Sequence, residues 1–235
     1  MTGDRKDRDP GRFLHETFGP AVSLFLLCSH NRIRRFSNKA AISTRVFSHL
    51  SLVTCHVSKL KEMKDFEIRI AVADDVGPLI ELGLRTFNDT FAHLNSVEDM
   101  EAYISTAFTR EQILSELADP LSTFLLAETD GRAIAYAKLH RGEAPDGVSP
   151  ARAIELARLY VDKEMHGKGV AHKLMEEMLR LATAEAFTSI WLGVWEHNER
   201  AKAFYRKWGF RDAGKHIFQL GSDAQTDLLM VREVR

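Results

Sequence analysis

The chain is poor in cysteine and contains no long hydrophobic run. Its 235 residues include two cysteines, Cys28 and Cys55, and both lie among the first 62 residues. The rest of the chain therefore has no disulfide, no thiolate zinc site and no cysteine nucleophile. No apolar stretch approaches the roughly 20 residues that cross a bilayer, and no G-x-S-x-G motif marks a serine nucleophile. We therefore expect no membrane span and no covalent acyl-enzyme.

Acidic residues are missing from one long N-terminal stretch. Between Thr17 and Lys61 there is no Asp or Glu, and the segment shows no sustained hydrophobic period. Three interpretations fit this composition: a translation start placed too far upstream, with Met63 as the true start; a disordered tail; or an organellar targeting segment. We favour the first. We expect residues 1–62 to lie outside a single cytoplasmic domain formed by residues 63–235.

The segment from Met63 onward is acidic. It carries 21 Lys and Arg against 28 Asp and Glu, a net charge of −7. That sign disfavours binding to a nucleic acid and favours the attraction of cationic substrates. The histidines of this segment do not show metal-ligand spacing with carboxylates, so we predict no metal site. We interpret four of them as mostly structural or surface groups, and these are His93, His140, His197 and His216.

Regular hydrophobic patterns begin at Phe66 and continue to the end of the chain. Stretches that alternate apolar and polar residues, such as FEIRIAV at 66–72, predict strands, and stretches with a period near 3.6 predict helices. The predicted order is a strand, two or three helices, three strands, a helix, a strand, a helix and two strands. This order predicts an α+β (α/β mixed) fold, in which a twisted mixed sheet of about seven strands is flanked by helices around one core.

The most informative stretch is RLYVDKEMHGKGVAHKLMEEMLRL, at residues 158–181, where a strand runs through a glycine loop into a helix. Gly167 and Gly169 stand where the chain must turn tightly. The first backbone N–H groups of the following helix lack partners within the helix. Together with the positive end of the helix dipole, they suit a pyrophosphate. A plain structural turn is the alternative interpretation of this motif.

A second motif follows about thirty residues later, at residues 198–210, and reads N-x-x-A-x-x-F-Y-x-x-x-G-F. Together the two motifs resemble the GNAT superfamily of acyl-CoA-dependent N-acetyltransferases, and the resemblance covers about residues 66–234. The family motif Q/R-x-x-G-x-G/A maps onto His166, Gly169 and Ala171. His166 therefore stands where Gln or Arg is usual, and a phosphate contact made by the backbone should not depend on this side chain.

The resemblance implies a GNAT-like sheet that splays between its two central strands to admit the pantetheine arm of acetyl-CoA. It also implies that the loop amides hold the pyrophosphate and that Tyr205 protonates the departing thiolate. Acetyl-CoA is then the co-substrate. The residues implied in its binding are Leu159, Tyr160, Val161, His166, Gly167, Lys168, Gly169, Val170, Ala171, His172, Asn198, Lys202 and Tyr205.

Several stretches outside the CoA motifs are similar to PaiA-type spermidine/spermine N-acetyltransferases. They include TFNDTF (86–91), EDM (98–100), ELARLYV (155–161), IWLGVWE (190–196), GKHIF (214–218) and QTDLLM (225–230). This similarity implies a small-molecule polyamine as acceptor. Two alternatives remain open: a protein or peptide N-terminal acetyltransferase, and a CoA-binding or amine-sensing regulator with little turnover. We expect a monomer or a homodimer.

The chemistry requires a proton acceptor. An amine attacks a thioester only in its neutral form, yet a free alkylamine has a pKa near ~10.4. Glu155, on the strand that approaches the glycine loop, is the leading candidate to take the proton through a water molecule. An ordinary surface or ion-paired carboxylate is the alternative. Because no nucleophile is evident, we predict direct acetyl transfer in a ternary complex.

A polycationic acceptor needs carboxylates along its binding groove. Glu98, Asp99 and Glu101, at the start of a predicted helix, are available for this role. Acidic residues also favour helix starts for electrostatic reasons, so a solvated helix end is the alternative. Trp195, at the end of a predicted strand near the site, is either a core residue or a cation–π partner of the acceptor.

Overall fold

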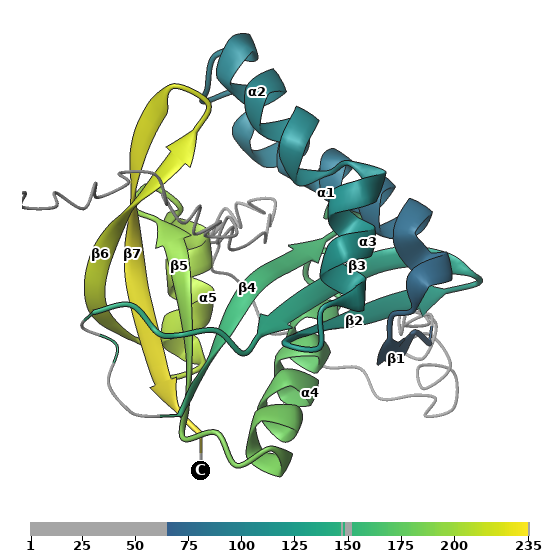
Figure 1. The fold of residues 1–235 in the computed structure, drawn as a ribbon. Coiled ribbons are helices and arrows are strands. Elements are labelled where there is room, and N and C mark those ends of the chain that lie inside the picture. The colour runs from purple at the N-terminus through teal and green to yellow at the C-terminus, as the bar shows by residue number, and fades with distance from the viewer. Residues whose placement is uncertain (1–64, 147, 149–151, 235) are drawn as a thin grey trace, which may run out of the picture.

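The computed structural model describes residues 65–146, 148 and 152–234, so the prediction for residues 1–62 lies outside the described residues. Seven strands form one sheet in the order β1-β2-β3-β4-β5-β7-β6 (Figure 1). Only β4 and β5 are parallel to each other. The predicted seven-stranded mixed sheet is therefore confirmed. The strands are β1 (Glu67–Ile70), β2 (Ser122–Thr129), β3 (Arg132–His140), β4 (Ala153–Val161), β5 (Ser189–Trp195), β6 (Arg211–Leu220) and β7 (Asp223–Glu233).

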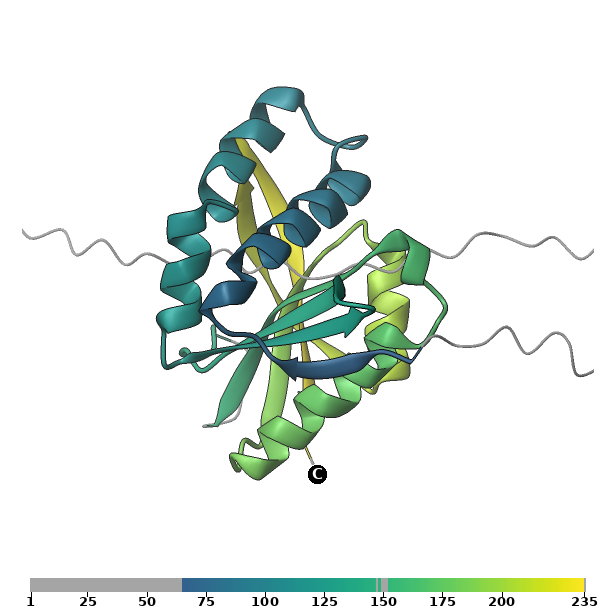
Figure 2. The ribbon, with the colours of Figure 1, turned by 90° about the vertical axis from the view of Figure 1, so that its right-hand side faces the viewer.

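Helices cover both faces of the sheet (Figures 1 and 2). Three helices lie on one face: α1 (Val76–Phe91), α2 (Val97–Ala107) and α3 (Arg110–Ala118). The other face carries α4 (Val170–Ala184) and α5 (Glu199–Lys207). Short 3-10 turns, η1 (Ala73–Asp75) and η2 (Lys163–Met165), precede α1 and follow β4.

The sheet divides the apolar side chains into two main clusters, where the sequence predicted one core. Each strand of a sheet covered on both faces sends alternate residues to opposite sides. The α4-side core includes Leu139, Leu156, Leu159, Leu174, Met178, Ile190, Leu192 and Tyr205. The α1-side core includes Leu79, Leu82, Phe87, Tyr103, Phe108, Phe124, Tyr136 and Tyr160.

Two helices begin where their capping residues predict. The hydroxyl of Ser96 accepts a hydrogen bond from the N–H of Asp99, and that of Thr109 accepts one from the N–H of Gln112, each at 3.1 Å. Each bond satisfies an N–H group that the helix itself leaves without a partner. The starts of α2 and α3 are therefore determined locally by the sequence.

The two central strands separate after a short paired region. β4 and β5 are in register only at Ala153–Ser189, Ile154–Ile190 and Glu155–Trp191. Beyond these pairs, β4 continues to Val161 and β5 to Trp195, and the two strands diverge as Figure 1 shows. The predicted splay is confirmed, and Glu155 lies at the point where it begins.

Candidate active site

The loop between η2 and α4 presents an exposed set of backbone N–H groups. Gly167 and Gly169 have φ angles of 73° and 82°, a left-handed conformation that favours glycine. A Cβ at either position would meet nothing within 4 Å, so the backbone angle, and not crowding, calls for glycine. The first N–H that bonds back at this helix end is that of Lys173, to the carbonyl of Gly169. The N–H groups of residues 170–172 thus remain at the helix end, and this geometry fits a phosphate group.

Asp162, the residue that follows β4, anchors the entry to this loop. It is buried, and its carboxylate accepts hydrogen bonds from Arg85 at 2.9 Å and from Arg132 at 2.7 Å. The N–H of Glu164 donates to the same carboxylate. Burial opposes ionisation, but this N–H and the two guanidinium groups hold the pKa of Asp162 below its usual value. The network ties η2 to α1, and no local pattern in the sequence predicts it.

His166 is used to fix the loop to β4. Its Nε2 lies 2.9 Å from the carbonyl oxygen of Val161, and its side chain is half-buried. The neighbouring Lys168 is exposed, as is His172, whose ring centroid lies 4.4 Å from that of Trp208. Among the predicted CoA-binding residues of the loop, the exposed side chains of Lys168 and His172 flank the helix end. Leu159, Tyr160 and Val161 are buried in β4, and Val170 and Ala171 are buried in α4.

Asn198 and Lys202 shape the turn from β5 into α5. The Asn198 side chain accepts a hydrogen bond from the N–H of Ala201 at 3.1 Å and so caps α5. Lys202 is buried and donates to the backbone carbonyl of Glu196 and, at 2.7 Å, to the carboxylate of Glu199. These contacts stabilise the turn. The predicted roles of both residues in CoA binding stay predictions.

Tyr205 lies in α5 and is fully buried in the α4-side core. Its ring packs against Phe204 and Phe210, with ring centroids 5.7 Å and 5.3 Å apart. α5 starts directly after β5, one of the two strands that splay. Tyr205 therefore lies on the helix that directly follows a strand bordering the opening. Its predicted role as an acid stays a prediction.

Glu155 occupies a buried position where the splay begins. It pairs in register with Trp191 and is 9% exposed. Burial raises its pKa to about 7, although the positive charges of Lys138, His216 and Arg158 oppose the shift. In the part of the chain that the structure describes, Glu155 forms no ion pair. A carboxylate with this pKa is half ionised near neutral pH and can accept a proton there.

A buried ion network lies beside Glu155, and the sequence analysis missed it. Arg158 donates to both oxygens of Glu116, at 2.6 Å and 3.0 Å, and Lys138 lies 3.1 Å from the same carboxylate. All three side chains are buried. One carboxylate thus faces two cations, which leaves a positive surplus on the α1-side face of the sheet. The signal in the sequence is a basic residue among the apolar residues of each of two strands, Lys138 in β3 and Arg158 in β4.

Asp227 and His216 face each other on the terminal hairpin. They are in register between β7 and β6, and Nε2 of His216 lies 3.7 Å from Oδ2 of Asp227. Asp227 is 4% exposed, and its burial raises the pKa of its carboxyl group against the effect of the His216 contact. The sequence predicted a structural or surface role for His216 and gave none to Asp227.

The acidic residues predicted to bind the acceptor lie at the start of α2. Asp99 accepts hydrogen bonds from the hydroxyls of Ser96 at 2.7 Å and Ser222 at 2.8 Å, so it joins α2 to the β6–β7 turn. These hydrogen bonds lower its pKa. Glu98 and Glu101 are exposed and make no hydrogen bond or ion pair with any described residue. Of the three predicted acceptor-binding residues, Glu98 and Glu101 are therefore the two whose carboxylates contact only solvent.

Trp195 ends β5 and is half-buried. Its ring lies edge-on to Phe91 of α1 at 6.0 Å and to His197 at 5.1 Å. The ring therefore packs on the α1-side core while part of it remains accessible. No group of three His, Cys, Asp or Glu suited to a metal ion occurs within residues 65–146, 148 and 152–234. No helix of the same residues is long and apolar enough to cross a membrane.

Comparison with known proteins agrees with this geometry. The model of the Acetyltransferase (GNAT) family matches residues 87–210. The chain is 34% identical over 156 residues to an uncharacterized N-acetyltransferase in the pepI 3' region of Lactobacillus delbrueckii subsp. lactis, which covers 66% of this chain and 90% of the relative. It is 28% identical over 149 residues to the spermidine N(1)-acetyltransferase of Thermoplasma acidophilum. This match covers 62% of this chain and 88% of the relative.

Among solved structures, the chain is similar to the PaiA N-acetyltransferase of Thermoplasma acidophilum in complex with coenzyme A. The TM-score is 0.60 at 25% sequence identity, and the match covers 72% of this chain and 99% of that chain. The similarity extends over the whole of the related structure, and therefore includes both halves of the splayed sheet.

Proposed function

The chain belongs to the GNAT acetyltransferase family and is an acetyl-CoA-dependent N-acetyltransferase, and on this basis we propose that it acetylates a primary amine of a polyamine such as spermidine. Transfer is direct, within a ternary complex. Two observations support the choice of acceptor. One relative is a spermidine acetyltransferase, and the segment from Met63 carries a net charge of −7, which attracts polycations.

The position and the pKa of Glu155 are the main support for this proposal. An acceptor amine arrives as an ammonium ion and must lose a proton before it can attack. Glu155 is buried where β4 and β5 part, forms no ion pair within the described residues, and has a pKa of about 7. It is therefore available as the proton acceptor near neutral pH, directly or through one water molecule.

The N-terminus of α4 supports the binding of acetyl-CoA. Gly167 and Gly169 turn the loop into α4, where the N–H groups of residues 170–172 precede the first N–H that bonds back within the helix. These groups, with the helix dipole, bind a pyrophosphate. The unpaired edges of β4 and β5 beyond Glu155 leave backbone groups available to an extended pantetheine arm.

The residues then divide the chemistry between two sides of the splay. Glu155 accepts the proton that the ammonium ion loses, and the new bond then forms between the neutral amine nitrogen and the thioester carbon. Tyr205 donates its hydroxyl proton to the sulfur as the carbon–sulfur bond breaks. The nitrogen loses a second proton as the amide forms, and exchange of this proton through solvent restores the Tyr205 hydroxyl. Glu155 then releases its own proton to solvent, so the products are the N-acetylated amine, free CoA and one proton.

A panel of acceptors assayed for release of free CoA tests this proposal. Spermidine and spermine should give the highest kcat/KM, above simple monoamines and above a peptide with a free N-terminal amine. A preference for the peptide would instead assign an N-terminal acetyltransferase. Binding of acetyl-CoA without CoA release from any amine would assign a regulator.

A further inference from the structure

Five carboxylates are buried within the described residues, and they fall into two groups. Three form ion pairs with arginine at 2.6 to 2.9 Å. The other two have no lysine or arginine partner among the residues described. The paired group comprises Asp75, Glu116 and Asp162, and the other group comprises Glu155 and Asp227.

Asp227 is the member of the second group that the reaction proposed above does not use. A buried carboxylate without a cation is unfavourable, because burial removes its hydration and nothing replaces it. The contact of Asp227 with His216, at 3.7 Å, supplies a full charge only when the imidazole is protonated. The carboxylate is therefore arranged to gain from a cation that comes from outside the chain.

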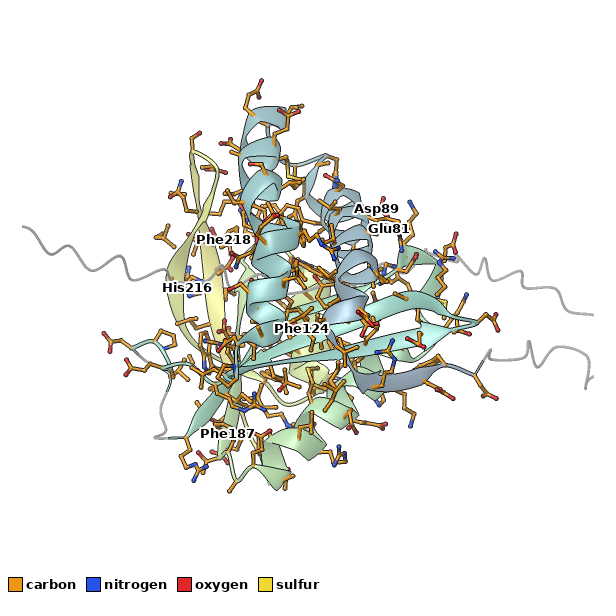
Figure 3. The ribbon with its side chains drawn as sticks, turned by 45° about the vertical axis from the view of Figure 1, so that its right-hand side comes forward. Glu81, Asp89, Phe124, Phe187, His216 and Phe218 are labelled. Carbon is orange, nitrogen blue, oxygen red and sulfur yellow. The ribbon has the colours of Figure 1, made fainter. Side chains whose placement is uncertain are left out.

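The backbone of β5 makes room for this pair. A Cβ at Gly193 would lie 3.0 Å from Cε1 of His216 and 3.3 Å from Oδ2 of Asp227. Such contacts are closer than ordinary side-chain packing, so glycine at this position allows His216 and Asp227 to lie flat over β5. Figure 3 labels His216 and Phe218 on the hairpin that carries this surface.

The surroundings are suited to an alkylammonium chain. Tyr103 of α2 lies edge-on to Phe218 of β6, with ring centroids 5.6 Å apart. Its hydroxyl is buried and has no hydrogen-bond partner among the described residues. Burial raises the pKa of Tyr103, and the charge of Asp227 adds to this effect, so the hydroxyl lies within electrostatic reach of the carboxylate. A buried hydroxyl without a partner is satisfied when a polar ligand or a water molecule binds next to it.

The two carboxylates without a lysine or arginine partner belong to one region. His216 contacts Asp227, and its charge also acts on Glu155. Glu155 lies on the edge of β4 where the splay begins, and Asp227 lies opposite Trp195, at the far end of β5. An acceptor that spans the splay therefore meets Glu155 with one end and Asp227 with the other.

We propose that Asp227 binds a second ammonium group of the acceptor, one that is not acetylated, and that it thereby selects dications over monocations. This inference rests on the proposed amine acetyltransferase activity and adds the residue that determines acceptor choice. Asp227 holds the distal ammonium group, while the proximal nitrogen lies near Glu155 and is acetylated. An acceptor with one amino group leaves Asp227 without a cation and gains nothing from it.

The test compares 1,4-diaminobutane with butylamine, which differ by the second amino group. In the wild-type enzyme the diamine should have the higher kcat/KM. Asp227→Asn keeps the shape of the side chain and removes its charge, so the ratio of the two values should fall about tenfold or more. The kcat/KM for butylamine should fall less than that for the diamine, and the KM for acetyl-CoA should stay near the wild-type value. An Asp227→Asn enzyme that keeps the wild-type ratio would overturn the proposal.

Asp223→Asn is the matched control. Asp223 lies in the same strand as Asp227 but is exposed, and the substitution removes the same charge from the molecule. Its diamine-to-monoamine ratio should stay at the wild-type value. An equal loss in both variants would show that general electrostatic attraction, and not a binding contact, sets the preference.

Gly193→Ala provides a second variant that keeps the charge. Its methyl group would push His216 and Asp227 away by a few tenths of an ångström, so the diamine-to-monoamine ratio should fall. An unchanged ratio would count against the proposal even if Asp227→Asn fails to fold. Failure of the proposed function is separate: no CoA would then be released from any amine by the wild type. In that event, calorimetry with 1,4-diaminobutane and CoA decides, since equal affinity in the wild type and Asp227→Asn overturns the inference and weaker affinity in the variant supports it.

Discussion

The ionisation of Glu155 reflects a balance between burial and neighbouring charge. Burial alone would keep the carboxyl group protonated, while Lys138, His216 and Arg158 favour the carboxylate. The result is a pKa of about 7, where a base is both present and strong enough to act. Because Glu116 neutralises only part of the Lys138 and Arg158 charge, the ion network beside Glu155 contributes to this balance.

The pH dependence of the reaction follows from that pKa. As the proposed base, Glu155 acts in its ionised form, so kcat/KM should rise with pH through about 7 and then level off until another group titrates. Glu155→Gln should lower kcat about 10²- to 10⁴-fold and remove this rise. Steady-state rates between pH 5.5 and 9 measure both effects. A Gln variant with the wild-type pH profile would exclude Glu155 as the base.

Tyr205 is tested by removing its hydroxyl alone. Tyr205→Phe keeps the ring that packs against Phe204 and Phe210, so the fold should be preserved. Loss of a general acid costs about 10²- to 10⁴-fold, and kcat should fall by that factor while acetyl-CoA affinity stays near the wild-type value. Turnover within a few-fold of wild type would show that Tyr205 is a packing residue only.

At the level of single residues, the site residues predicted from the sequence are those that belong to contiguous motifs. Glu155 and the glycines stand in recognisable stretches, and the structure places them at the splay and at a helix end. Asp227 and Glu116 escaped because their importance comes from partners 11 and 42 residues away. Strand pairing and helix packing bring these partners together, and neither is visible in local spacing.

The predicted role of the loop that leads into α4 can be tested with a single substitution. Gly169→Asp adds a negative charge where the pyrophosphate is proposed to bind, and it also strains a backbone with a φ of 82°. Acetyl-CoA affinity, measured by calorimetry, should fall at least tenfold. Gly131→Asp is the control, because Gly131 has a φ of 72° and open space around it but lies in the β2–β3 turn. Equal losses in both variants would attribute the effect to strain.

Elements with local signals were predictable, and those that depend on long-range packing were less so. The starts of α2 and α3 follow from Ser96 and Thr109, each of which caps its own helix. The division of the apolar residues into two clusters was not predicted, because alternation within a strand covered on both faces leaves no polar side to reveal it. The link between η2 and α1 through Asp162 was missed because its partner Arg85 is 77 residues away in the sequence.

On the scale of the whole molecule, the sheet consists of two halves joined by three residue pairs. β1 to β4 form one half and β5 to β7 the other, and only Ala153 to Glu155 pair with β5 (Figure 1). The two cores lie on opposite faces and extend across this junction. The opening beyond Glu155 is therefore a consequence of the topology, and both proposed substrates approach the same few residues.

All strands of the described sheet come after residue 66, which bears on the predicted boundary at Met63. The Lactobacillus relative is covered over 90% of its length by 156 residues of this chain. A protein that starts at Met63 should therefore keep the melting temperature and the turnover number of the full chain. Thermal unfolding and CoA release at equal concentration test this, and loss of either property would place part of residues 1–62 in the domain.

The net charge of the segment from Met63 gives a prediction that no single side chain determines. A body with a charge of −7 attracts polycations over distances that salt shortens, with a Debye length near ~10 Å at 0.1 M. The kcat/KM for spermidine should therefore fall as ionic strength rises, and that for butylamine should fall less.

Replacement of the solvent-exposed Glu98 and Glu101 by glutamine, together with Asp99→Asn, should raise the KM for spermidine more than that for acetyl-CoA. An unaltered KM, together with an equal salt response of both amines, would show that the acceptor does not approach along the start of α2.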